Sequence, residues 1–552
     1  MLTSPARMNQ PFTEGWFPRK WYIKADHWPQ RLLHIPSMTS VARDEHGVYR
    51  APGTQDEVRP KYNILTYTWG RFRAEDVAGN LALPVQNTHW KIPPIKKEHF
   101  TVDQFKSVVA FLASDGIKWA WIDIACIHQE DEAENAEEVG RQASIFKNAH
   151  RVFVWLSELS FSVLVPAIAS IQDHGIQLRK HVDNDPTALP IQDIISSLLK
   201  ECNTVFNEPW FSSLWTLQEV VLRNDALVLA KEAKPIEWFP NQYMYMTMFI
   251  NHCQNMFRDL EFLADSIKES KRRNQPISEE QLQMDTQIHD IKQRILEAGF
   301  YYTFSDNPNV QYGTAKYRKT SRTVDRVYAI MQVYNIRVGK SLNPARNPQL
   351  PELLDEFAKA IVDTCPIMSQ MFVHTRVPAD GASWRITEAS RVPNFLCMYR
   401  DPKPLGELVI ESGVMIARGP LCSFIPIDEM DQRTDIGLKI YLDEYVIEDL
   451  GFSQSTLSRE HIHGRQLLKQ YGYDALQVLW LGSVQRNLES VFVRAQIGII
   501  LTPLKPVEGN EQLQDRIYRR LGICTWIFAP SKSLGYEFSP NMPWRQVDIQ
   551  IH

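Results

Sequence analysis

Apolar segments with the composition of buried β-strands alternate with helical segments between residues 62 and 230. The strand-like segments are rich in β-branched and aromatic residues and cover residues 62–68, 119–127, 152–156 and 226–230. After the first of them, Thr101 and Gln104 form a capping box that starts an amphipathic helix. Strands separated by helices require right-handed crossovers, which produce a mostly parallel sheet with helices on both faces. The sequence therefore predicts an α/β domain.

The chain is too long for one hydrophobic core, since it has 552 residues. We expect four parts: an N-terminal extension (residues 1–59), the α/β domain (60–235), a helical segment that packs on it (236–345), and an α+β C-terminal region (346–552). Within the helical segment, Pro276 separates two helical patterns, and the second begins with a capping box of Ser278 and Gln281. The C-terminal region contains a helical pattern at 351–364, a hairpin pattern at 408–419 and a strand pattern at 491–501.

Charge and cysteine content restrict the compartment and the partners. A net charge of −5 gives no general attraction to phosphate, so we expect no nucleic-acid partner. The N-terminus lacks the apolar stretch of a secretory signal, and no apolar run is long enough to span a membrane. The seven cysteines are dispersed and odd in number, which favours a reducing, cytoplasmic location and no disulfide framework. The cysteines form no CxxC pair, so we expect no structural zinc site.

Three motifs carry the polar residues of the α/β domain: YNILTYTWG (residues 62–70), WIDIACIHQ (121–129) and PWFSSLWTLQE (209–219). The first two end where their strands end, and ligands of open α/β sheets bind at the carboxyl ends of the strands. The third places Trp215 and Glu219 one helical turn apart on the same face. The candidate site residues are Thr66, Tyr67, Trp69, Gly70, Asp123, Gln129, Trp215 and Glu219.

The order and spacing of these motifs resemble the heterokaryon incompatibility (HET) domain of filamentous fungi. YNILTYTWG is also similar to the first strand and loop of Toll/interleukin-receptor (TIR) domains. In addition, the W-x-x-x-E spacing of Trp215 and Glu219 looks like the segment that carries the glutamate of NAD-cleaving TIR domains. The resemblance implies a TIR-like, flavodoxin-like sheet and an effector of non-self recognition and programmed cell death. It also implies NAD as a substrate, not as a cofactor, with Glu219 as the catalytic residue.

Hydrolysis of the nicotinamide–ribose bond suits these residue types. The reaction passes through an oxocarbenium-like state, and a carboxylate beside the ribose stabilises the growing positive charge. Trp69 and Trp215 can stack on the rings of NAD, and Gly70 lets the backbone approach the ligand closely. TIR-like cleavage commonly requires contacts between copies, so self-association is expected for activity.

Each candidate also has a structural interpretation, and these alternatives remain open. Glu219 can be an exposed helix residue, Trp215 a core residue, and Asp123 a cap for a neighbouring loop. Likewise, His128 and Gln129 can turn the chain into the next helix. Cys126 fits an inert buried thiol better than a nucleophile, and EHIH (residues 460–463) lacks the HExxH metal-site spacing.

A non-catalytic adaptor that self-associates or docks a partner is the alternative function. The sequence departs from the HET pattern at several positions: Thr66 replaces a serine, Arg71 replaces an acidic residue, and Ser212 and Ser213 replace basic residues. A protein partner would bind the Met-rich helical segment or the C-terminal region. Weaker matches to HET proteins follow the core, at RTVDRVYAIMQ (322–332), at Ser383–Trp384 and at RRLGICTW (519–526).

Overall fold

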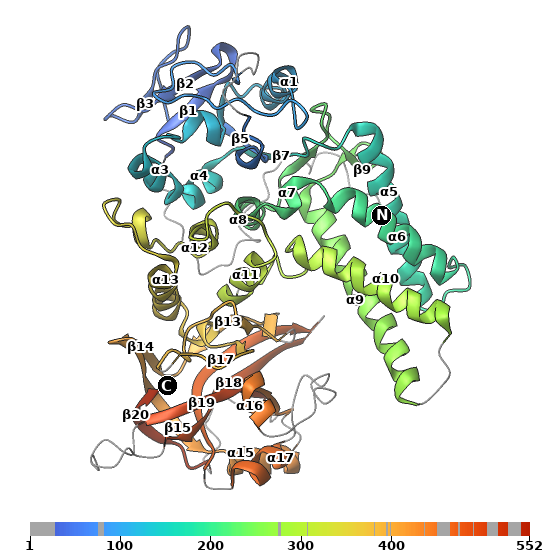
Figure 1. Ribbon diagram of the computed structural model, residues 1–552, viewed down its shortest axis with the longest axis vertical. Helices are drawn as coiled ribbons and strands as arrows, with labels where there is room; N and C mark the ends of the chain where they lie inside the picture. The colour runs from blue at the N-terminus through green and yellow to red at the C-terminus, as the bar shows by residue number, and fades with distance from the viewer. Residues whose placement is uncertain are drawn as a thin grey trace. The chain divides into compact units, whose positions relative to one another are not determined.

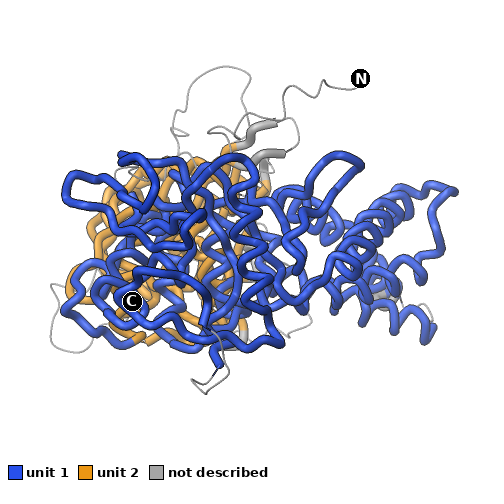
Figure 2. The backbone as a smooth tube through the Cα atoms, turned by 90° about the horizontal axis from the view of Figure 1, so that it is seen from above, with its two compact units in different colours: residues 1–303, 314–349 blue, residues 304–313, 350–552 orange. Residues whose placement is uncertain are grey.

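The computed structural model describes residues 28–552, except residues 75–81, 274–277, 306, 380, 394–395, 398, 435–436, 450–463, 473–474, 489–490, 505–516 and 528–541. It divides into two compact units (Figure 2). Unit 1 comprises Met1–Thr303 and Thr314–Gln349, and unit 2 comprises Phe304–Gly313 and Leu350–His552.

Unit 1 contains a six-stranded sheet in the order β2-β1-β6-β5-β7-β8 (Figure 1). Its strands are β1 (Arg31–His34), β2 (Thr39–Ala42), β5 (Tyr62–Thr66), β6 (Trp119–Trp121), β7 (Arg151–Trp155) and β8 (Leu227–Leu229). The last four are parallel to one another, whereas β1 and β2 are antiparallel additions beside β6. A parallel sheet with intervening helices confirms the α/β prediction for this part of the chain. The sequence pattern did not reveal β1 and β2, which lie before residue 60.

Strand order locates the position where a ligand site is expected. From β5 the chain passes through α1 (Val102–Leu112) to β6 on one side, and β7 then pairs with β5 on the other side. Across the sheet the four parallel strands therefore stand in the order β6-β5-β7-β8, whereas along the chain β5 comes before β6. The order reverses between β5 and β7, and such a switch point opens a crevice at the carboxyl ends of the strands.

Three segments differ from the sequence prediction in their boundaries. The strand expected at 119–127 ends at Trp121, and α2 (Asp123–Cys126) is a short helix. Apolar composition does not distinguish a buried strand from a buried helical turn. The acidic residues from Glu130 to Glu138 and the apolar face of Val139, Ala143 and Phe146 predict one helix, but the structure interrupts it at Gly140 between α3 (Glu132–Val139) and α4 (Gln142–Asn148). The Arg337 guanidinium packs against this glycine. The helix that the pattern of the third motif predicts at residues 212–222 begins at Leu214 as α8 (Leu214–Leu222), and a separate short helix, α7 (Pro209–Ser212), precedes it.

Four long helices of unit 1 pack against one another: α5 (Phe161–Val182), α6 (Ile191–Phe206), α9 (Met246–Arg272) and α10 (Glu279–Glu297). Helix α5 contacts α6 and α9, and α10 contacts the same two helices (Figure 1). The predicted capping box at Ser278 and Gln281 is confirmed. The helical hairpin of α9 and α10 was predicted, but its pairing with α5 and α6 was not. Among the described residues, no helix has the length and apolar character needed to cross a membrane.

Unit 2 combines α13 (Leu350–Thr364) with an eight-stranded sheet in the order β13-β17-β18-β19-β20-β15-β14, in which β16 pairs with β19. Its strands are β13 (Tyr399–Pro404), β14 (Glu407–Glu411), β15 (Val414–Ser423), β16 (Lys439–Leu442), β17 (Gln477–Leu488), β18 (Val491–Pro503), β19 (Ile517–Ile527) and β20 (Arg545–Ile551). Strand β15 also pairs with β17, so five strands form a closed circuit of pairings. The predicted hairpin joins β14 to β15, and Ser412 and Gly413 both have positive φ at its turn.

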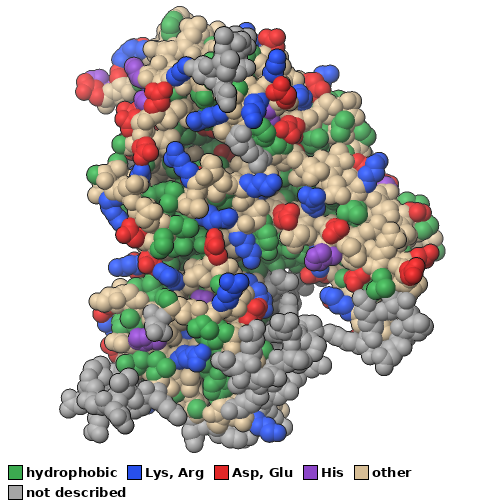
Figure 3. Space-filling view, in the orientation of Figure 1, with side chains coloured by type: hydrophobic (Ala, Val, Ile, Leu, Met, Phe, Trp, Pro, Cys, Tyr) green, Lys and Arg blue, Asp and Glu red, His purple; other side chains and the backbone are tan. Residues whose placement is uncertain are grey.

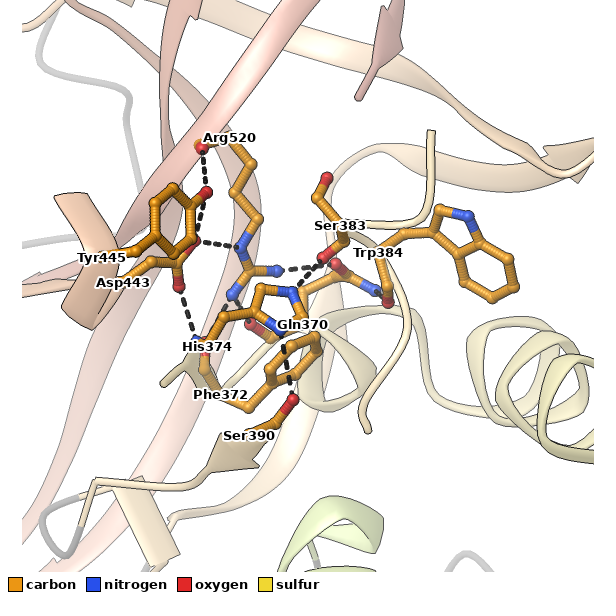
Figure 4. A network of polar contacts seen from close by, with 9 residues as sticks. All are labelled: Gln370, Phe372, His374, Ser383, Trp384, Ser390, Asp443, Tyr445 and Arg520. Carbon is orange, nitrogen blue, oxygen red and sulfur yellow. Dashed lines mark hydrogen bonds and ion pairs between the residues drawn. The ribbon is translucent and has the colours of Figure 1, made fainter. Parts of the chain in front are cut away.

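A buried polar network joins four segments of unit 2, which contain residues 370–374, residues 383–384, Asp443 and Arg520 (Figure 4). Arg520 on β19 is fully buried and donates to the side-chain and backbone oxygens of Gln370 and to the backbone oxygen of Phe372. Its Nε lies 3.8 Å from Oδ2 of Asp443, whose Oδ1 accepts the backbone N–H of His374 at 2.8 Å. The segments Ser383–Trp384 and 519–526, singled out in the sequence, therefore meet in one core.

Charges of both signs are interspersed on the face of the molecule that Figure 3 displays. This distribution accords with the small net charge of −5.

Candidate functional site

Thr66 ends strand β5 and brings two distant residues together. Its Oγ1 accepts a hydrogen bond of 2.8 Å from the indole Nε1 of Trp210 and donates a hydrogen bond to Oε2 of Glu219. Trp210 belongs to α7 and Glu219 to α8, so the third motif packs against the end of the first. Thr66 is 2% exposed and Trp210 is fully buried, whereas Glu219 is partly exposed. The glutamate thus lies at the carboxyl end of the central parallel strand.

Asp123 connects the first and second motifs. Its Oδ2 accepts a 2.5 Å hydrogen bond from Nε1 of Trp69, and its Oδ1 accepts the backbone N–H of Ile124 at 2.7 Å. The side-chain amide of Gln129 donates to the backbone oxygens of Asp123 and Ile127 and so holds the turn after α2. Asp123 therefore has the loop-clamping contact that its structural interpretation requires, and it is near enough for its charge to act on Glu219.

The pKa values of both carboxyl groups are raised, and the charge of Asp123 acts on Glu219. Burial raises the pKa of Glu219 to about 8, the Thr66 hydrogen bond opposes this rise, and the charge of Asp123 adds to it. Burial likewise raises the pKa of Asp123 to about 6, against the lowering effect of its hydrogen bonds and of Arg73. Both residues nevertheless retain some exposed surface. Two neighbouring carboxyls with separated pKa values are typical of sites where one is neutral while the other is ionised.

The other expected site residues have different surroundings. The indole Nε1 of Trp215 donates to Oδ2 of Asp325 at 3.3 Å, so this tryptophan ties α8 to α12 (Asp325–Met331). Tyr67 is buried among Phe100, Phe105 and Trp155, and this burial, together with the charge of Asp123, raises the pKa of its phenol. Gly70 is exposed, and a Cβ built on it would meet no atom within 4 Å among the described residues. The part of the chain that the structure describes therefore leaves the space beside Gly70 unfilled.

Three further residues near these motifs were not singled out from the sequence. Trp210 lies within the third motif, so its position was a usable signal. The guanidinium of Arg73 stacks on the Trp69 ring at 4.7 Å from the centroid and remains exposed. His99 is buried, with Nε2 donating to the backbone oxygen of Thr68 at 2.6 Å and Nδ1 facing Oε1 of Glu158 at 2.9 Å. No sequence spacing relates His99 to the motifs.

Thiol and metal chemistry receive no support near the motifs. Burial raises the pKa of the Cys126 thiol to about 12, which keeps it protonated and inert at neutral pH. Within the described residues, no group of three or more His, Cys, Asp or Glu side chains could hold a metal ion. EHIH at 460–463 lies outside the described residues. The ring nitrogen Nδ1 of His128 accepts backbone N–H groups of Glu130 and Asp131, which is the turn-forming role.

Residues 62–219 match the family model of heterokaryon incompatibility protein (HET). The matched segment begins with strand β5 and ends at Glu219, so it includes all three motifs. This part of the chain is therefore a HET domain, which confirms the resemblance of the three motifs to that domain. No curated protein and no solved structure matches the chain.

The raised pKa values predict that the protein loses stability as the pH rises. Four buried or partly buried carboxyls have folded-state pKa values between about 6 and 8: those of Asp123, Glu138, Glu208 and Glu219. An unfolded chain releases these protons near pH 4, so between pH 4 and 8 the folded protein binds more protons. The contribution of these four carboxyls to the free energy of unfolding is full below pH 4, declines as the pH rises above 4, and is lost once the pH has passed through their folded-state pKa values of about 6 to 8.

Thermal unfolding measured from pH 5 to pH 8.5 checks this expectation. The midpoint temperature of unfolding should fall as the pH rises. It should fall less steeply in Glu219→Gln, because glutamine does not titrate. An equal pH dependence in both proteins would mean that the Glu219 carboxyl titrates normally.

Proposed function

We propose that this chain is a HET-domain effector of heterokaryon incompatibility and the associated cell death, and that its HET domain hydrolyses NAD at the nicotinamide–ribose bond. The observation that carries the proposal is the placement of Glu219. Its carboxyl lies at the end of strand β5, one oxygen is held by Thr66, and the side chain keeps an exposed surface. Such a carboxylate, directed at developing positive charge, suits cleavage of an N-glycosidic bond.

Glu219 would act in its ionised form. The bond between ribose C1′ and the pyridinium nitrogen breaks, and its electron pair neutralises the nitrogen, so nicotinamide leaves without a general acid. The positive charge that remains on the ribose is stabilised by the Glu219 carboxylate. A water molecule then adds to C1′ and releases one proton, which Asp123 or solvent can accept. The cationic ring of arriving NAD favours ionisation of Glu219, because an opposite charge lowers a carboxyl pKa.

Strand order supports the finer proposal of a TIR-like fold. The four parallel strands follow the flavodoxin-like order 2-1-3-4, with Thr66 at the switch point. In this arrangement the dinucleotide would lie along Trp69, on which Arg73 stacks. It would pass through the space beside Gly70, which no described residue fills.

A specific observation also favours the non-catalytic alternative. Both carboxyls already accept hydrogen bonds from protein side chains, Glu219 from Thr66 and Asp123 from Trp69. These bonds tie the three motifs together and would do so equally in an adaptor. Helices α5, α9 and α10 expose apolar side chains (Ile176, Phe262 and Leu282), which a partner protein could contact.

Assembly is expected to control the proposed activity. If cleavage requires contacts between copies, as the resemblance to TIR domains implies, a dilute monomer should be nearly silent. Fusing the full chain to a tetrameric coiled coil should then raise NAD loss and nicotinamide release per molecule by about tenfold or more. The unfused chain at the same subunit concentration is the control. Equal activity per molecule in both forms would contradict the assembly requirement, and no activity in either form would favour the adaptor.

A further inference from the structure

We propose that Thr66 is a positioning residue, and that Trp210 orients its hydroxyl so that the hydrogen is donated to Glu219. The inference rests on the proposed function of Glu219. It assigns the hydroxyl a role other than substrate contact, because Thr66 is 2% exposed and both of its hydrogen bonds are made inside the protein.

The direction of the two hydrogen bonds follows from the donors. An indole Nε1–H can only donate, so Oγ1 of Thr66 must accept from Trp210. A threonine hydroxyl carries one hydrogen, and the Trp210 bond does not use it. The hydrogen is therefore free to point to Oε2 of Glu219, its other partner. The relay runs one way, from Trp210 to Thr66 to Glu219.

Trp210 is itself held in place. Its backbone oxygen accepts hydrogen bonds from Oγ1 of Thr216 at 2.5 Å and from Nη1 of Arg318 at 3.1 Å. Arg318 is 2% exposed and also donates to the backbone oxygens of Ser213 and Ala298. The break between α7 and α8 is thus clamped by a buried guanidinium. These bonds fix the backbone of Trp210, and its indole is fully buried, so the indole N–H is presented to Thr66 with little conformational freedom.

The relay has two consequences for Glu219. First, it commits Oε2 to Thr66, so Oε1 is the oxygen available to ribose hydroxyls. Among the described residues no donor to Oε1 is found, and the Glu219 side chain is partly exposed. Second, a hydrogen bond donated to a carboxylate favours its ionised form. Thr66 thereby opposes the effect of burial on the pKa of Glu219. Both consequences prepare the glutamate for the reaction.

The test compares Thr66→Val, which removes the hydroxyl and keeps the shape, with Thr66→Ser, which keeps the hydroxyl. For the assembled full-length protein, we expect the acidic limb of kcat/KM for NAD to move to higher pH by about one unit in Thr66→Val. Activity at neutral pH then falls by about tenfold, since one pKa unit is a factor of ten. At high pH, where Glu219 is ionised anyway, the loss should shrink to a few-fold. Thr66→Ser should restore the parent profile.

A second measurement does not depend on activity. The pH dependence of unfolding, compared between each Thr66 variant and the same variant carrying Glu219→Gln, reports the pKa of Glu219 through the linkage of protons to folding. This pKa should be higher in Thr66→Val and in Thr66→Ala than in the parent. If Thr66→Val folds poorly, the smaller alanine variant gives the same comparison.

The outcomes separate the two proposals. A Thr66→Val protein with the parent's pH profile, or with an equal loss at every pH, would overturn the positioning role. A parent that cleaves no NAD would contradict the proposed function. The unfolding measurement would then still decide whether Thr66 governs the ionisation of Glu219.

Discussion

Replacing Glu219 by Gln is expected to lower NAD cleavage by about 100-fold or more while the protein stays folded. A carboxylate directed at developing positive charge contributes on the order of 3 kcal/mol or more to transition-state stabilisation, and a neutral amide cannot replace it. The oxygen of glutamine can still accept the Thr66 hydrogen bond. The binding geometry is therefore kept while the charge is removed.

The stability of Glu219→Gln should change little, by about 1 kcal/mol or less. Burial already raises the pKa of Glu219 to about 8, so at neutral pH the free protein holds the residue largely in its uncharged form, which glutamine resembles in size and polarity. Glutamine is also a good helix former, as the position on α8 requires. Loss of activity can then be separated from loss of fold.

The measurement is NAD loss and thermal unfolding on the same preparations of the assembled protein. Glu280→Gln, on the exposed first turn of α10, is the matched control and should retain parent activity. A stable Glu219→Gln protein that cleaves NAD at the parent rate would remove Glu219 from the site.

Local pattern was sufficient to predict the parallel strands and the three motifs. Strands β5, β7 and β8 are short, apolar and rich in β-branched residues, and each occurs where the pattern places it. The boundary of β6 was not predictable in the same way. The segment after Trp121 remains apolar, yet it turns into α2, where Asp123 accepts the N–H of Ile124. Side-chain burial looks the same in a strand and in a helical turn.

The contacts of the site are long-range, so no spacing encodes them. Thr66 and Glu219 are 153 residues apart. The sequence placed both near one sheet edge through the rule for ligand sites in α/β folds, but it gave no indication of which pairs bond. Trp215 shows what spacing cannot predict. Its spacing from Glu219 predicts a shared helix face, but its indole donates a hydrogen bond to Asp325, which lies about a hundred residues later in the chain.

Removing the carboxylate of Asp443 should destabilise unit 2 by about 3–5 kcal/mol. Asp443 and Arg520 have fully buried side chains (Figure 4), and Asp443→Ala would leave the Arg520 guanidinium charged without its counter-ion. Burial lowers the pKa of Arg520, and the charge of Asp443 counteracts this effect. The backbone N–H of His374 would lose its acceptor as well. Both losses occur in a region without access to water.

Asp443→Asn separates the two causes, because the amide oxygen can still accept the His374 N–H while the charge is gone. Its stability should lie between those of the parent and Asp443→Ala. Chemical unfolding of the full chain gives the size of the effect, and hydrogen exchange of residues 370–374 and of strand β19 assigns it to unit 2. A loss below about 1 kcal/mol in Asp443→Ala would mean that Gln370 and the backbone oxygens alone satisfy the guanidinium.

A paired replacement completes the argument. Arg520→Met combined with Asp443→Leu removes both charges and keeps apolar volume, and buried ion pairs replaced in this way are often no less stable than the parent. Gln370 and Phe372 would lose a donor, at about 1–3 kcal/mol for an unsatisfied buried acceptor, and the His374 N–H would lose its acceptor as it does in Asp443→Ala. We therefore expect the double variant to be more stable than Asp443→Ala but less stable than the parent. Stability at the level of Asp443→Ala would indicate that the hydrogen bonds of Arg520, and not its charge pairing, join strand β19 to the 370–374 segment.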